Sequence, residues 1–349
     1  MKNFLEQVEK WKSILILVAM LLGVLIGHYW EGYREFISSL EIAGINILLS
    51  IVILILLLPT FVVINYSKFK EVEEYKRGIT ATALINWIVQ PLSMVLIAWL
   101  YFSLIMGNVL DQELQQAYIQ GAILLGAAPC TILVFLWSKK MKGNAEYTLA
   151  QVLLNDLILL IAYVPLVTVL LLITGVNDLV PIGKVMLTSI VSILIFVVLP
   201  ITIAMVIKII VNRETNKVIK QYKQDAIIAP FNFAGEFLLY VMVGLIFTMQ
   251  SENIWDNPVH ILIIAVPLSI QILIVYFIAF FTNKVLKIPK DVAGPSMLIA
   301  ASNFFELALV VAIAIFGADS PVALATSVGI LIEIPLMLGL VKITNTFYK

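Results

Sequence analysis

Two residues stand out by their chemistry and position, and the first is a cysteine. Cys130 is the only cysteine among 349 residues, and it directly follows Pro129 in the segment Gly126-Ala-Ala-Pro-Cys-Thr131. A proline inside a helix removes a backbone donor and clashes with the carbonyl four residues back, so the helix must break or kink there. Inside lipid, the freed carbonyls are tolerated only where protein or water satisfies them. Cys130 is therefore a candidate substrate ligand; the alternative is an inert, small apolar side chain.

The second residue is an acid within another apolar segment. Glu306 lies about 14 residues into residues 292–316, about 21 Å along a helix, and the nearest basic residue is Lys290. An acid at this depth costs several kcal/mol unless it is neutralised, paired or hydrated. Ser302 and Asn303 precede it by four and three residues, which would place them on its helical face. Glu306 is a candidate proton carrier, or else a protonated acid that only links two helices.

Two further acids lie inside apolar segments. Asp156 follows Asn155, and Glu333 lies two residues before Pro335. Either one is an ion or proton relay, or it makes only an interhelical hydrogen bond.

The elements that must position these residues are transmembrane helices. Apolar residues make up 62% of the chain and charged residues 13%, which indicates an all-α membrane protein. The net charge of zero leaves no basic face for nucleic acid, a single cysteine excludes an internal disulfide, and no motif calls for a cofactor. We expect ten spans, at residues 13–29, 46–65, 79–104, 117–137, 147–174, 185–207, 229–249, 259–281, 292–316 and 321–343.

The loop charges predict an orientation for these spans. Of the 22 lysines and arginines, all but Arg34 and Lys184 lie in the termini and the alternate loops on one side. Because positively charged loops stay in the cytoplasm, we expect both termini on the cytoplasmic side. The membrane is expected to be the plasma membrane.

The spacing of the prolines and the site residues suggests an internal repeat. Pro91 precedes Cys130 by 39 residues, and Pro267 precedes Glu306 by 39 residues. The common offset of 176 maps the first five spans onto the second five. We therefore expect one polytopic membrane domain, 1–349, made of two inverted five-helix repeats at about 11–175 and 183–349. Inverted repeats with interrupted helices point to a site at the membrane midplane.

Several motifs follow one another between about residue 80 and residue 342. They are Asn86-Trp87 followed by Pro91, Gly126-Ala-Ala-Pro-Cys-Thr-Ile-Leu-Val-Phe-Leu-Trp-Ser138, Gly143-Asn-Ala-Glu-Tyr-Thr-Leu-Ala-Gln-Val-Leu-Leu-Asn-Asp156, Ala301-Ser-Asn-Phe-Phe-Glu-Leu-Ala308 and Gly329-Ile-Leu-Ile-Glu-Ile-Pro335. Together they resemble the Acr-type arsenite permeases of the bile acid/sodium symporter superfamily. The resemblance implies that the fourth and ninth helices are unwound and cross at the midplane, with Cys130 and Glu306 as the functional pair. Many members have Ala-Arg-Cys where this chain has Ala128-Pro129-Cys130, which leaves the substrate range open.

The resemblance and the chemistry together predict a secondary transporter that exports arsenite, with antimonite as a second candidate, in exchange for protons. Trivalent arsenic favours thiolate ligands, and a single thiol, Cys130, would hold it transiently. The expected substrate-binding residues are Cys130, Glu306, Thr131, Asn303, Ser302 and Asn86, and the expected coupling residues are Glu306, Asp156 and Glu333.

The alternative function is a sodium-coupled symporter of an organic anion. Its sodium ligands would include Asn303 and Glu306, and Cys130 would be idle. An intramembrane enzyme is disfavoured, because no span holds a His-Glu-x-x-His pair or a serine with a plausible base. The oligomeric state does not follow from the sequence.

Overall fold

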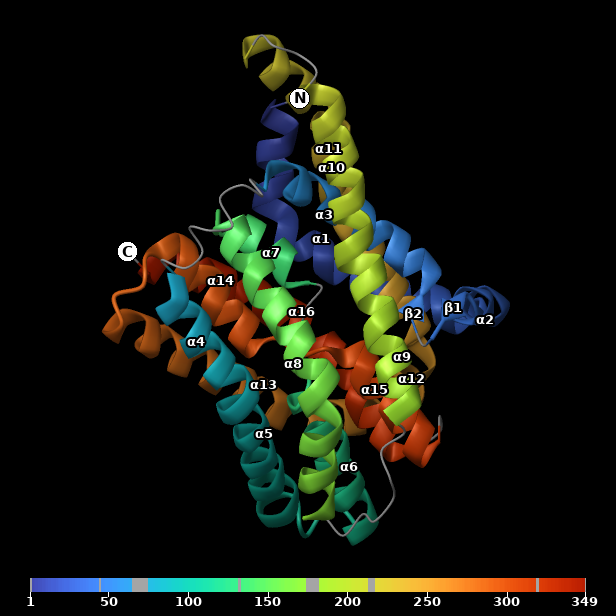
Figure 1. Ribbon diagram of the computed structural model, residues 1–349. Helices are drawn as coiled ribbons and strands as arrows, with labels where there is room; N and C mark the ends of the chain where they lie inside the picture. The colour runs from blue at the N-terminus through green and yellow to red at the C-terminus, as the bar shows by residue number, and fades with distance from the viewer. Residues whose placement is uncertain are drawn as a thin grey trace. The chain divides into compact units, whose positions relative to one another are not determined.

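The structure is a computed structural model of a nearly all-helical chain (Figure 1). It describes residues 2–43, 45–64, 75–130, 133–173, 182–212, 217–317 and 320–348. The strands of the described residues are β1 (Glu41–Ile42) and β2 (Ile45–Asn46), which form one short antiparallel hairpin. The described residues form two compact units, residues 1–63 with 194–258 and residues 64–193 with 259–349.

Five described helices are long and apolar enough to cross a membrane, and a sixth span results if the bent pair Ile14–Tyr29 and Glu31–Ser39 counts as one. The prediction of an all-α membrane protein is confirmed. The count of ten spans and their inverted repeat stay predictions. Interrupted segments are divided into helices shorter than a span, so length and composition alone do not identify them. The five long helices are Lys76–Ile105, Ala145–Leu172, Met186–Val211, Pro258–Val285 and Pro321–Phe347.

The first unit is held together by close contact between α1 (Lys2–Tyr29) and α11 (Lys217–Met249). A Cβ atom built on Gly23 would lie only 2.5 Å from the backbone oxygen of Gly244, and one built on Gly27 would clash with Thr248 and Ser251. Small residues let two apolar helices approach this closely inside lipid. The unit also contains α2 (Glu31–Ser39), α3 (Ile47–Val63), the π-helix η4 (Leu194–Val198), α10 (Leu199–Asn212) and α12 (Ser251–Asp256).

The second unit contains every candidate site residue. One of its long helices is built from α4 (Lys76–Leu84), the π-helix η2 (Ile85–Val89), α5 (Gln90–Trp99) and the π-helix η3 (Leu100–Ile105). Pro91 is the second residue of α5, just after η2. Because proline cannot donate to the carbonyl four residues back, the wider π turn accommodates it. The remaining full-length helices are α8 (Ala145–Leu172), α13 (Pro258–Val285) and α16 (Pro321–Phe347). The shorter helix α9 (Ile182–Ile193) follows α8 in the chain.

Two segments of this unit are interrupted. The helix α6 (Gln112–Gly126) ends before Pro129, and α7 (Val134–Lys140) begins beyond it. The helix α14 (Lys290–Ala301) is followed by an extended residue, Ser302, and α15 (Phe305–Phe316) begins three residues after Ser302.

Candidate functional site

The two interruptions pair with each other, and we call residues 127–130 and 302–304 the paired breaks. Pro129 and Asn303 form an isolated antiparallel bridge. On either side of it, the Cys130 N–H donates to the Ser302 carbonyl at 3.1 Å, and the Phe304 N–H donates to the Ala128 carbonyl at 2.7 Å. Backbone groups that left their helices thus find partners in each other, as an apolar environment requires. Pro129 fits the bridge because both N–H donors belong to other residues, Cys130 and Phe304.

The only thiol of the chain is enclosed in this arrangement. Cys130 is 3% exposed, and its backbone is fixed by Ser302. The structure therefore brings together Cys130, Ser302 and Asn303, three of the predicted substrate ligands. Thr131 lies outside the described residues.

An acid from a third helix contacts the paired breaks directly. The Ser302 hydroxyl donates to Oε1 of Glu333, and the Asn303 N–H donates to Oε2 at 3.4 Å. Glu333 lies on α16 and is 1% exposed. Glu333 accepts one side-chain and one backbone hydrogen bond from the same break. Any movement of that break therefore changes the hydrogen bonds of this buried carboxyl group.

The expectation that Ser302, Asn303 and Glu306 share a helical face is wrong. That spacing argument requires a continuous helix, but residues 302–304 lie between α14 and α15. Glu306 is instead the second residue of α15 and half-buried. The first turn of a helix carries partial positive charge from its free N–H groups, which attracts a carboxylate placed there.

Two buried glutamines complete the surroundings of the paired breaks, and the sequence reasoning missed both. The Gln90 side-chain amide donates to Oδ1 of Asn303 at 2.6 Å and to the Ser302 carbonyl at 3.2 Å. The Gln271 amide on α13 donates to the Gln90 carbonyl at 3.4 Å. Both side chains are fully buried. A polar amide inside an apolar span was the available signal, since glutamine at this depth needs partners.

The remaining predicted residues lie on neighbouring helices of the same unit. Asn86 is in η2, one turn before Gln90, and is fully buried; neither its Oδ1 nor its Nδ2 has a hydrogen-bond partner among the described residues. Asp156 is on α8 and is 4% exposed.

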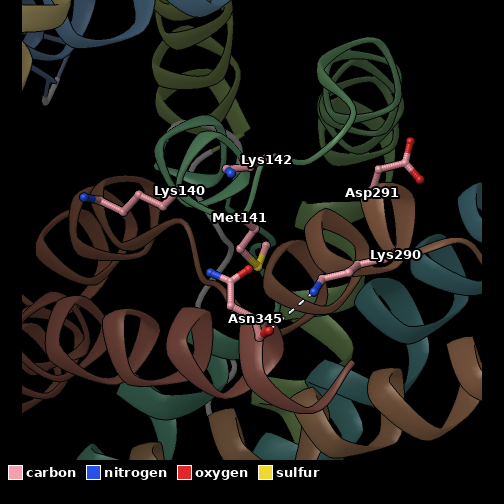
Figure 2. Close-up of a pocket in the computed structure, with 6 residues that line it drawn as sticks. All are labelled: Lys140, Met141, Lys142, Lys290, Asp291 and Asn345. Atoms are coloured by element: carbon pink, nitrogen blue, oxygen red, sulfur yellow. Dashed lines mark hydrogen bonds between the residues drawn. The ribbon is translucent and has the colours of Figure 1, made fainter. Parts of the chain in front are cut away.

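A separate surface pocket opens at one end of this unit. It has a volume of about 570 Å³ and lies where α7 and α16 end and α14 begins (Figure 2). Lys290 donates to the Asn345 carbonyl across it at 3.4 Å. None of the predicted site residues lines it; its lining is Lys140, Met141, Lys142, Lys290, Asp291 and Asn345.

Comparison with known proteins places the fold in a family. Residues 50–257, more than half of the chain, match the sodium bile acid symporter family. The chain belongs to this family. It is 38% identical over 337 residues to the arsenical-resistance protein Acr3 of Alkaliphilus metalliredigens, covering 97% of this chain and 92% of that protein. Acr3 of Corynebacterium glutamicum is 30% identical over 339 residues, with 95% and 87% covered. An uncharacterized transporter of Synechocystis is 30% identical over 344 residues, with 96% and 88% covered.

These similarities confirm the resemblance that the motifs indicated. As a member of the sodium bile acid symporter family, the chain is a multi-pass membrane transporter and not an enzyme. The candidate substrate site is the paired breaks. They contain the single thiol of the chain and donate two hydrogen bonds to Glu333.

Proposed function

We propose that this transporter exports arsenite from the cytoplasm in exchange for protons, with antimonite as a second substrate. The observation that carries the proposal is the single buried thiol at the paired breaks, in a chain whose relatives at 38% and 30% identity are named arsenical-resistance proteins.

The thiol supplies a reversible bond. Arsenite in neutral solution is mostly the trihydroxide, and its soft arsenic centre favours sulfur. Attack by the Cys130 sulfur forms one As–S bond and breaks one As–O bond, and the departing hydroxyl leaves as water with the thiol proton. Three thiols would hold arsenic tightly, and the described residues contain no cluster of that kind. One thiol, at paired breaks that also contain Ser302 and Asn303, holds arsenite weakly enough for release.

Two acids supply the coupling. Glu306 lies at the first turn of α15, and Glu333 accepts hydrogen bonds from Ser302 and Asn303. A carboxylate only accepts hydrogen bonds, whereas its protonated form also donates one. Protonation of Glu333 therefore changes the contacts of the break that holds the Cys130 backbone. Asp156, buried on α8, is a third relay candidate. One charge moved across roughly 100 mV is worth about 2.3 kcal/mol, about a fiftyfold gradient.

The transport cycle is alternating access in an inverted-repeat framework. The segments α6–α7 and α14–α15 are the unwound fourth and ninth helices, and they cross at the midplane. Each compact unit contains one stretch from each predicted repeat. In the first unit these stretches are residues 1–63 and residues 194–258. This division supports repeats at 11–175 and 183–349. The loop charges support ten spans, with both termini cytoplasmic in a plasma membrane.

The family description favours one alternative, sodium-coupled symport of an organic anion. Arsenite accumulation in everted vesicles distinguishes the two functions. We expect accumulation under an imposed proton gradient and none under a sodium gradient, with Cys130→Ser and Glu306→Gln both inactive. Full activity of Cys130→Ser would reject the thiol as ligand, and accumulation driven by sodium alone would favour the alternative.

A further inference from the structure

Buried polar side chains form two stripes in the second unit. Binding of arsenite by the Cys130 thiol does not explain why these polar side chains are there. Within each stripe the members are four residues apart, so they share one face of their helix. All six side chains are 0% exposed. The stripe on α4, η2 and α5 consists of Thr82, Asn86 and Gln90, and the stripe on α8 consists of Tyr147, Gln151 and Asn155.

The two stripes meet at their first residues. Thr82 Oγ1 lies 2.9 Å from the Tyr147 hydroxyl and 2.7 Å from Oγ of Ser296 on α14. Figure 1 shows that the α4–α5 helix and α8 run in the same direction. Asn86 and Gln151 therefore both lie one turn, about 6 Å, beyond the Thr82–Tyr147 contact.

The stripe on α4, η2 and α5 ends at the paired breaks. Gln90 contacts Ser302 and Asn303, whereas Thr82 contacts Ser296 earlier on α14. Asn86 is thus bracketed between a hydroxyl cluster and the candidate substrate site. We call Thr82, Tyr147, Ser296 and Asn283, whose Nδ2 donates to Ser296 Oγ at 2.9 Å, the hydroxyl cluster.

Between these two ends, the amides lack protein partners. Gln151 Nε2 donates to Asn155 Oδ1 at 3.3 Å. Five other amide atoms have no hydrogen-bond partner among the described residues, namely both atoms of Asn86, Oε1 of Gln90, Oε1 of Gln151 and Nδ2 of Asn155. Buried polar groups are almost always bonded by protein or by ordered water. The set mixes donors and acceptors, which suits water, whereas a cation would need acceptors alone.

We propose that ordered waters bind these amides and form a column through which a proton leaves Glu333 for the cytoplasm. This deepens the proposed function and rests on its proton coupling. The O–H bond of protonated Glu333 breaks, and the Ser302 hydroxyl accepts that proton while it releases its own to the column. Each water, and then each hydroxyl of the hydroxyl cluster, accepts one proton and gives one. The end products are the Glu333 carboxylate and a hydronium ion in the cytoplasm.

A contact between the starts of α8 and α14 links the hydroxyl cluster to a surface pocket. Asn144, three residues before Tyr147, accepts the Tyr147 N–H through its side chain, and its own N–H donates to the Asp291 carbonyl at 2.7 Å. Asp291 lines the pocket in Figure 2 and lies five residues before Ser296 on α14. The start of α14 thus borders a charged, solvent-facing pocket, and it contacts the start of α8, which carries Tyr147 of the hydroxyl cluster.

Radiolytic hydroxyl-radical labelling of the wild-type protein tests the column, because radicals formed from bound water oxidise the side chains beside it. Tyr147, Tyr163 and Tyr276 are all 0% exposed and so form a matched set. We expect Tyr147 to be labelled at least tenfold faster than Tyr163 and Tyr276. Equal rates would overturn the proposal.

Transport tests whether the column carries the proton. We expect Tyr147→Phe to slow proton-driven arsenite accumulation at least fivefold, with arsenite quenching of tryptophan fluorescence unchanged. Tyr276→Phe removes another buried tyrosine hydroxyl, which is 2.8 Å from Thr344 Oγ1, and should leave the rate unchanged. An unaffected Tyr147→Phe rate would refute the proton path. If the wild type shows no proton-driven accumulation, the proposed function fails, while the labelling contrast still decides whether the column exists.

Discussion

Replacing Gln90 by leucine tests how far the paired breaks depend on a side chain that is distant in sequence. Leucine has a similar volume but removes the donor to Asn303 Oδ1 and the Ser302 carbonyl. Each buried acceptor left unsatisfied costs about 1–3 kcal/mol. Only Asn303 Oδ1 is left unsatisfied, because the Ser302 carbonyl still accepts the Cys130 N–H. The predicted loss in the free energy of unfolding is therefore about 1–3 kcal/mol, since bulk water does not reach these buried groups to replace the lost donor.

The matched control is the same substitution at Gln115. Its amide also donates to two acceptors, the Gly107 carbonyl at 3.3 Å and the Leu110 carbonyl at 2.7 Å, but it is only partly buried. Water can replace those bonds, so Gln115→Leu should cost less than about 1 kcal/mol. Reversible unfolding in mixed detergent micelles, followed by circular dichroism, measures both variants. An equal loss in the free energy of unfolding for the two variants would show that burial at the paired breaks does not determine the cost of losing these hydrogen bonds.

Three further predictions concern other contacts. Gly27→Leu should lower the unfolding free energy by about 1–3 kcal/mol through overpacking against α11. Gly32→Leu should not, because a Cβ atom built on Gly32 has no neighbour within 4 Å. Thermal unfolding compares the two variants. Asp111→Ala removes the side chain that accepts the Leu114 N–H at 2.8 Å and caps α6, so it should cost about 1 kcal/mol in the same assay. Glu333→Gln should abolish proton-driven arsenite accumulation in everted vesicles while arsenite still quenches tryptophan fluorescence; retained accumulation would remove Glu333 from the coupling.

The local chemistry of single residues was readable from the sequence, and contacts between distant residues were not. Pro129 predicted an interrupted helix at Cys130, because the missing N–H is a property of proline in any fold. The i, i+4 relation of Ser302 to Glu306 failed, because α14 ends at Ala301. The acid that contacts Ser302 is Glu333, 31 residues away, and the spacing rules of one helix do not describe a contact between two.

The sequence by itself determined the membrane class, the family and the candidate thiol, because apolar run length, motif order and the position of a lone cysteine are properties of the chain alone. Only the tertiary structure decided that the two interruptions satisfy each other's backbone, that Gln90 and Gln271 support them, and that the two polar stripes meet at the Thr82–Tyr147 contact. Those pairings depend on which helices pack together, and a hydrogen bond between elements exists only after that packing has brought its donor and acceptor within about 3 Å.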